Sequence, residues 1–139
     1  MGANTLTMIG GGTLSNTNAL ELNHANSLLT LDGTVTIGKA SVTAASNTGK
    51  GLDVNDNTTI QTFSQTKSSR IDIANGKSLT LTDSFEVPAD QTMELHGDGG
   101  GTLNISDNLT LSGILKLNAQ NNTLANGKLV FNNGVLDVD

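Results

Sequence analysis

Short apolar pairs recur along the whole chain. Each pair has apolar residues at positions i and i+2, and eighteen such sites, fifteen of them complete pairs, run from Leu6 to Leu136. Alternation at period two is the pattern of a short strand with one buried face. β-Branched residues, Gly and Asn interrupt every candidate helix. The chain is therefore predicted to be almost wholly β.

The spacing of these pairs predicts a repeat architecture. They group by threes, and successive groups begin 21 to 27 residues apart, at Leu6, Leu29, Leu52, Leu79, Leu103 and Leu124. Three short strands per repeat can bury their inward side chains only against the repeats above and below. We predict one domain over residues 1–139, an all-β parallel β-helix (β-solenoid) of about six three-strand coils with a period of about 23 residues, right-handed because parallel crossovers favour that hand.

This register places the first strands of coils two to five in one aliphatic ladder. Its predicted members are Leu29, Leu31, Leu52, Val54, Leu79, Leu81, Leu103 and Ile105. An antiparallel sandwich or meander is the alternative. It expects hairpin dipeptides, which occur at only four of the seventeen connections: Asp32-Gly33, Asn75-Gly76, Asn126-Gly127 and Asn133-Gly134. The solenoid is the better interpretation.

Composition excludes several classes of function. Seven basic and thirteen acidic residues give a net charge of −6, which disfavours nucleic acid as a partner. The absence of cysteine excludes disulfides, thiolate zinc sites and cysteine nucleophiles. We find no apolar run long enough to span a membrane, so no membrane insertion is expected, and no signal peptide in residues 1–12.

One step between repeats is longer than the others, and it directs attention to residues 62–70. We interpret this segment as an insertion loop in the third coil. Binding residues of solenoids usually lie on segments that leave the repeat. The candidates for binding are Phe63, Lys67 and Arg70, which include two of the seven basic residues. Phe63 turning inward to fill the bend is an equal alternative.

Three aspartates occupy the same position after a predicted first strand: Asp56, Asp83 and Asp107. Stacked on successive coils, their carboxylates would repel one another, and a calcium ion with oxygen ligands could relieve that repulsion. The simpler interpretation is that each carboxylate accepts a hydrogen bond from the backbone two residues on and ends its strand in an Asx turn. Calcium is thus a possible cofactor, and no other cofactor is predicted.

The predicted register bears on two further functions. Asp72 and Glu94 lie on the outer face of the predicted third strands, where glycan-active β-helix enzymes gather their acidic groups. Six coils are short for such an enzyme, so none of these residues is assigned a catalytic role. Thr-x-Thr pairs such as Thr34 and Thr36 would suit an ice-binding face. The predicted outward series breaks that array, because it runs Thr7, Thr30, Asp53, Thr80 and Asn104.

Leu-x-Leu strands between Gly, Asn and Asp turns extend over the entire chain, as in Ser78-Leu79-Thr80-Leu81. In this pattern, and in its Asn/Thr/Ser/Gly-rich, cysteine-free composition, the chain resembles the passenger regions of bacterial autotransporters and filamentous-haemagglutinin-like adhesins. The resemblance implies a β-helix exported to the bacterial cell surface or the extracellular space, with a role in adhesion or aggregation.

The apolar strand pattern begins by Leu6 and continues to Val138, with no polar cap before or after it. Terminal repeats normally need such caps, and open end strands pair with any edge that arrives. We therefore expect a non-enzymatic structural module that stacks head-to-tail with copies of itself, or with neighbouring coils of a longer chain. The alternative is an adhesin module that binds a glycan or a cell-surface receptor through its side loops.

Overall fold

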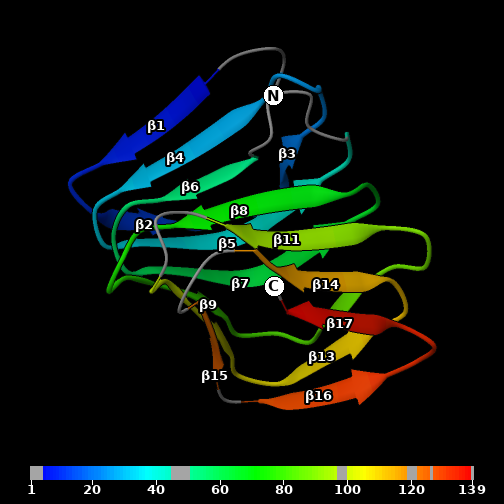
Figure 1. Ribbon diagram of the computed structural model, residues 1–139. Coiled ribbons are helices and arrows are strands. Elements are labelled where there is room, and N and C mark those ends of the chain that lie inside the picture. The colour runs from blue at the N-terminus through cyan, green and yellow to red at the C-terminus, as the bar shows by residue number, and fades with distance from the viewer. Residues whose placement is uncertain (1–4, 45–50, 97–99, 119–121, 126, 139) are drawn as a thin grey trace.

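The protein is built from strands alone. The computed structural model describes residues 5–44, 51–96, 100–118, 122–125 and 127–138, and this described part contains seventeen strands and no helix. Every ladder between described strands is parallel. The strands wind into a β-solenoid of about five turns with a period of about 23 residues (Figure 1). The predicted all-β parallel solenoid is confirmed at this level.

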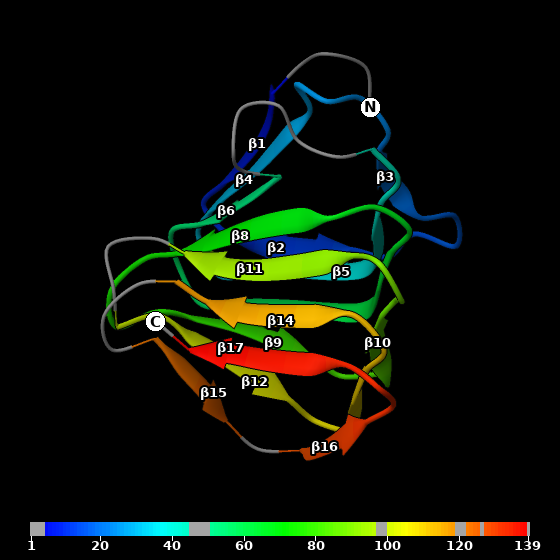
Figure 2. The same cartoon turned by 45° about the vertical axis from the view of Figure 1, so that its right-hand side comes forward.

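Three sheets form the faces of the solenoid. Sheet A contains β1 (Thr5–Ile9), β4 (Leu28–Asp32), β6 (Leu52–Val54), β8 (Ser69–Ile73), β11 (Thr92–His96), β14 (Ile114–Leu117) and β17 (Val135–Val138). Sheet B contains β2 (Gly12–Leu14), β5 (Val35–Val42), β7 (Thr58–Gln65), β9 (Ser78–Leu81), β12 (Thr102–Ile105) and β15 (Thr123–Ala125), and β3 (Leu20–Leu22) pairs with β5. Sheet C contains β10 (Phe85–Val87), β13 (Asn108–Leu111) and β16 (Lys128–Phe131). Figure 2 shows the strands of sheet A stacked one above another in front of sheet B.

The core is a set of inward columns in which each side chain is covered by the rungs above and below it. In sheet A one column runs from Leu6 through Leu29 and Leu52 to Ile71. The three lower members are fully buried, whereas Leu6, on the first rung, is 38% exposed. Burial in this fold is therefore supplied by the neighbouring coil and not by residues of the same strand.

Two strands turn a corner of the solenoid without a loop. In β5 the buried residues alternate through Val35 and Ile37 and then resume at Ala40 and Val42, so the alternation changes phase at Gly38. The paired strand β7 changes phase in the same place, between Ile60 and Phe63. The inward side chains show which side of a strand faces the core. Because this side changes within each strand, the first half of the strand lies on the sheet B face and the second half continues in line with sheet C.

The predicted insertion loop at residues 62–70 is wrong. Residues 62–65 end β7, Ser69 and Arg70 begin β8, and only residues 66–68 lie between the two strands. The sheet C portion of this coil buries Phe63 and Gln65. Because a glutamine is not apolar, this strand does not appear as an apolar pair in the sequence, and the step between pairs looks longer than the others. The coil itself is short, since Leu52 pairs with Ile71, only 19 residues later.

Missing that rung shifts the predicted register by one strand from the third coil onward. Leu29, Leu31, Leu52 and Val54 lie in sheet A, whereas Leu79, Leu81, Leu103 and Ile105 lie in sheet B. All eight side chains are buried. They form two separate ladders on two faces of the solenoid and not the single ladder expected from the sequence.

Candidate functional site

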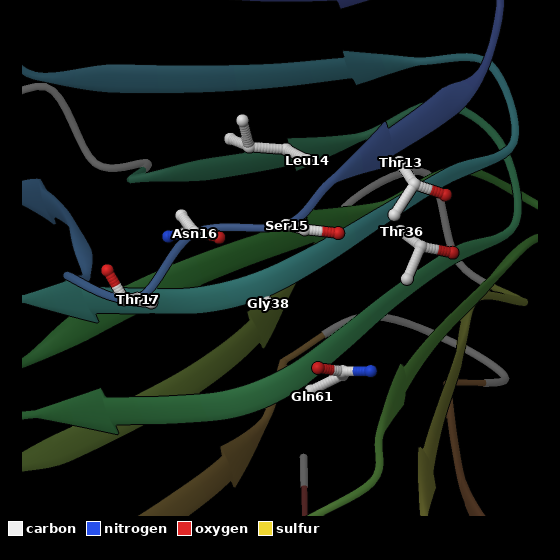
Figure 3. Close-up of a pocket in the computed structure, with 8 residues that line it drawn as sticks. All are labelled: Thr13, Leu14, Ser15, Asn16, Thr17, Thr36, Gly38 and Gln61. Atoms are coloured by element: carbon white, nitrogen blue, oxygen red, sulfur yellow. The ribbon is translucent and has the colours of Figure 1, made fainter.

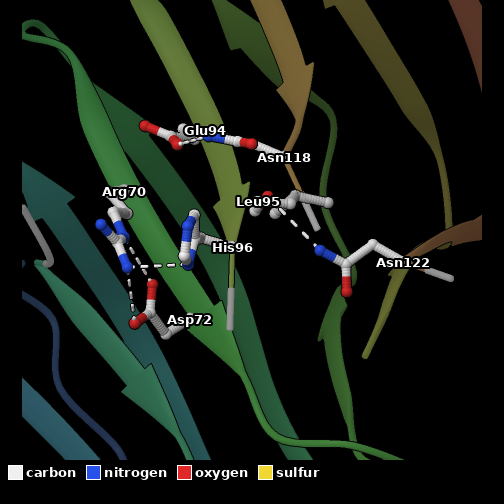
Figure 4. A network of polar contacts seen from close by, with 7 residues as sticks. All are labelled: Arg70, Asp72, Glu94, Leu95, His96, Asn118 and Asn122. Carbon is white, nitrogen blue, oxygen red and sulfur yellow. Dashed lines mark hydrogen bonds and ion pairs between the residues drawn. The ribbon is translucent and has the colours of Figure 1, made fainter. Parts of the chain in front are cut away.

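The outer face of sheet A carries a network of polar side chains from three successive rungs (Figure 4). Arg70, on β8, reaches Asp72 on the same strand with Nε 2.8 Å from Oδ1 and Nη2 3.3 Å from Oδ2. The same Nη2 lies 2.7 Å from Nδ1 of His96, on β11. A guanidinium has no acceptor atom, so Arg70 is the donor in this contact and Nδ1 of His96 is the acceptor.

This arrangement perturbs the guanidinium. Donation to the Asp72 carboxylate raises the pKa of Arg70 above its ordinary value, and the charge of Asp72 adds to the effect while burial opposes it. Arg70 was predicted to present its charge on a loop to a ligand. In the structure the cation is instead held in a two-pronged contact with a carboxylate, the geometry in which arginine bonds most strongly.

The next rungs extend the network with opposite charges. Glu94 pairs in register with Arg70 and with Lys116, and Lys116 pairs in turn with Asp137. Asn118 Nδ2 donates to Glu94 Oε1 at 2.6 Å. The column therefore alternates positive and negative along the solenoid axis. Asp72 and Glu94, considered from the sequence as acidic groups of an enzyme, are both bonded within this face.

Asn122 joins the same region from the side. Its Oδ1 accepts from the backbone N–H of Gly101 at 3.2 Å, and its Nδ2 lies 3.4 Å from the carbonyl oxygen of Leu95 (Figure 4). A side-chain amide whose donor and acceptor both bind backbone groups can replace the hydrogen bonds of a peptide group at a position outside any strand. The sheet A face is thus held together across coils by side chains as well as by ladders.

The other two predicted binding residues do not join Arg70 in a patch. Phe63 is only 3% exposed and packs against Phe85, with the ring centroids 5.2 Å apart. The prediction that Phe63 contacts an external ligand is therefore wrong, and the inward alternative holds. Lys67 is exposed on the short connection between β7 and β8.

The predicted aspartate ladder is also divided between two corners. Asp56 follows β6 of sheet A, whereas Asp83 and Asp107 follow β9 and β12 of sheet B. Asp56 Oδ1 accepts from Lys77 Nζ at 2.9 Å and from the backbone N–H of Asn57 at 2.8 Å. These two contacts, the lysine first, lower the pKa of Asp56.

Asp83 and Asp107 each accept a hydrogen bond from a hydroxyl group of the preceding coil. Thr62 Oγ1 donates to Asp83 Oδ2 at 2.5 Å, and Ser84 Oγ donates to Asp107 Oδ2 at 2.6 Å. The carboxylates therefore tie adjacent coils together at the corner between sheets B and C. Within the described ranges, no three His, Asp or Glu side chains gather as a metal site would require.

A shallow cavity of about 180 Å³ opens on the outer face of sheet B, beside the break between β2 and β3 (Figure 3). Thr13, Thr36 and Gln61 line it. Asn16 closes the break, because its Oδ1 accepts from the backbone N–H of Lys39 at 3.0 Å while its Nδ2 donates to the Lys39 carbonyl at 2.7 Å. This side-chain amide takes the place of a missing peptide group in the ladder.

Both ends of the solenoid expose apolar residues. At the first rung Leu6 is 38% exposed, and at the last rungs Phe131 and Val138 are 58% and 65% exposed. Val138 is aligned with Leu117 and Leu95, which are buried in the coils before it. In the described part of the chain, β1 pairs only with β4 and β17 only with β14. Neither of these two strands has a second partner among the described strands.

Comparison with known proteins gives no match to a family model, to a curated protein or to a solved structure. Among the described residues there is no helix of the length and apolarity needed to cross a bilayer.

Proposed function

We propose that this protein is a non-enzymatic structural module of a bacterial cell-surface or extracellular fibre, and that it stacks head-to-tail with copies of itself through the end rungs of its solenoid. The observation that carries the proposal is the exposure of inward columns at both ends. Leu6 and Val138 would each be covered by one further rung, as Leu29 and Leu95 are covered in the middle.

The chemistry of the ends suits such stacking. An open strand edge pairs with another strand through its free N–H and C=O groups, and burial of the aliphatic side chains beneath adds a favourable term of about 25 cal/mol per Å². In a parallel solenoid the first rung of one copy and the last rung of another run in the same direction. The contact is heterologous and does not close on itself, so it generates an open filament.

Two features of the proposal rest on general rules and on resemblance. The right hand of the coil follows the preference of parallel crossovers, and the count of six turns follows from grouping the apolar pairs by threes. Location outside the cell follows the likeness in pattern and composition to autotransporter passengers and filamentous-haemagglutinin-like adhesins. The polar network on sheet A supports a mechanical role, since it crosslinks three coils through Arg70, His96 and Glu94.

The test is electron microscopy and sedimentation velocity of the purified chain over a concentration series. We expect rods that lengthen with concentration and a fibre repeat of about 4.8 Å along the axis. Val138→Lys should shorten them, because the new ammonium would lie in the stacking contact. Val135→Lys is the matched control: Val135 lies in the same strand and is 53% exposed, but it pairs with the outward-facing Ile114 and not with a core residue.

Two results would overturn the proposal. One is a wild-type chain that stays a short monodisperse particle at every concentration. The other is equal loss of assembly in Val135→Lys and Val138→Lys, which would place the contact on the side of the solenoid and not on its end. Circular dichroism melting of both variants establishes that each remains folded.

A further inference from the structure

The outer face of sheet B presents threonines in register on four successive coils. Thr13 pairs with Thr36, Thr36 with Thr59, and Thr59 with Thr80, and the column continues to Asn104. The register predicted from the sequence aligns Thr80 with Asp53, whereas Asp53 lies in sheet A. The reason for excluding a regular threonine array therefore disappears with the corrected register.

A second column of small polar residues runs beside the first. Ser78 pairs with Thr102, and Thr102 pairs with Thr123. Asn57 lies beside Ser78 on the coil before it, and its Oδ1 accepts hydrogen bonds from both the backbone N–H and the hydroxyl of Ser78 at 3.1 Å. The two columns together make a two-dimensional array, with rungs about 4.8 Å apart and neighbouring positions on one rung about 6.7 Å apart. We call these residues the sheet B array.

The threonine hydroxyls of the first column are open to solvent partners. No described residue forms a hydrogen bond with the hydroxyl of Thr13, Thr36, Thr59 or Thr80, whereas the hydroxyls of Thr58, Thr62 and Thr82 all have protein acceptors. Threonine is stiff at χ1. Figure 3 shows Thr13 and Thr36 stacked in one orientation, with both hydroxyl oxygens on the same side.

Charge is absent from this array and present on the other two faces. Sheet A carries Arg70, Asp72, Glu94 and Lys116 on its outer side, and the strands in line with sheet C carry Glu21 and Glu86. The array residues, by contrast, are all Thr, Ser or Asn. In a chain with twenty charged residues, this face suits a neutral partner with a regular surface of hydrogen-bonding groups.

We propose that the sheet B array binds ice. Its rows of rigid methyl and hydroxyl groups hold water in a repeating pattern, and the cavity lined by Thr13, Thr36 and Gln61 extends the pattern with space for several ordered waters. A neutral sugar is a poorer fit, because sugar sites rely on aromatic faces. The chain has three phenylalanines and no Trp or Tyr, and Phe63 and Phe85 are buried.

The experiment measures thermal hysteresis and inhibition of ice recrystallisation by the purified protein. We expect the freezing point to fall below the melting point by an amount that rises with protein concentration. Thr59→Tyr places a bulky ring in the centre of the array and should reduce the hysteresis several-fold. The matched control is Thr110→Tyr, an equivalent outward threonine on β13 of sheet C, which should retain full activity.

The proposal is overturned if the wild-type protein gives no more hysteresis than an unrelated protein of the same charge, or if Thr110→Tyr loses as much activity as Thr59→Tyr. It is also overturned if Thr59→Tyr only dissociates a face-to-face dimer or abolishes binding to an insoluble polysaccharide, since the array would then serve another partner. Melting curves for both variants confirm that the comparison is made between folded chains. Because the array lies on a side of the rod, this outcome is independent of end-to-end assembly.

Discussion

Phe63 and Phe85 lie in contact across two successive coils, with their ring planes inclined at 53° and their centroids 5.2 Å apart. Tilted aromatic pairs at this distance stabilise the folded state by more than the burial of their surface alone would. Ala40, on the coil before, leaves room for the first ring. The two rings are the largest buried side chains in the sheet C columns, so they anchor the corner that β7 turns without a loop.

Removal of the first ring should weaken the whole solenoid. Phe63→Ala is expected to lower the free energy of unfolding by about 3–5 kcal/mol, because it leaves a cavity beside Phe85. Ser64→Ala is the control, since Ser64 is the next residue of β7 and points to solvent. Urea denaturation followed by circular dichroism measures both. Equal stability of the two variants would contradict the packing described here.

Charges introduced at inward positions should unfold the protein, whereas charges at the neighbouring outward positions should not. Leu81 and Ile105 pair with each other in sheet B and are buried. Leu81→Asp or Ile105→Asp would place an unpaired carboxylate in an apolar core. The cost is several kcal/mol, which is comparable with the total stability of a domain. Thr80→Asp and Asn104→Asp are the outward controls. Thermal melts of the four variants check the inward register of β9 and β12.

The buried glutamine depends on one hydroxyl. Ser69 Oγ donates to Gln65 Oε1 at 2.6 Å, and both residues are buried. Ser69→Ala should cost about 1–3 kcal/mol, because it leaves a buried acceptor without its partner. Replacing both residues, Gln65→Leu with Ser69→Ala, should cost less than the sum of the two single changes. A double-mutant cycle by urea denaturation measures this coupling, and strict additivity would refute it.

The Asp56–Lys77 contact predicts a specific pH dependence. The lowered pKa of Asp56 means that its ionised form is favoured in the folded state. Its stabilising contribution is therefore present above the ordinary aspartate value of about 3.9 and is lost as the pH falls through the lowered pKa. Lys77→Met removes the largest cause, so its melting temperature should fall below that of the wild type at neutral pH.

The gap between these two melting temperatures should then close in acid, where Asp56 is protonated in both proteins. Lys67→Met is the control, because Lys67 has no ion-pair partner among the described residues. Its difference from the wild type should not follow the titration of Asp56. A gap for Lys77→Met that persists unchanged in strong acid would show that the contact does not act through the carboxylate charge.

The sequence was sufficient for the fold class but not for the register. Parallel coils follow from apolar pairs at a regular spacing, and those pairs are visible without a structure. The third coil was misread because Gln65 occupies an inward position, where its amide is satisfied by Ser69. A buried polar residue interrupts the apolar pattern, and a strand that contains one is therefore not counted.

The candidate site was harder to foresee for the same reason. Arg70 and His96 are 26 residues apart and meet only because β8 and β11 pair with an offset of 24 residues. The sequence identified Arg70 as unusual but could not supply its partners. It also dismissed the threonine array, since an array exists only in the correct register. Local chemistry was thus readable from the residues, and the contacts between coils were not.

The direction of the ladders has a mechanical consequence. Hydrogen bonds between strands lie along the axis of the rod, so a pull on its two ends loads one rung at a time instead of shearing many at once. Such a rod would peel open from its ends at low force and lengthen greatly before breaking. The middle would resist most, because β5 and β7 are joined by a ladder that continues around a corner. Under tension the protein would extend by unfolding its end coils first, and its second and third coils would unfold at the highest force.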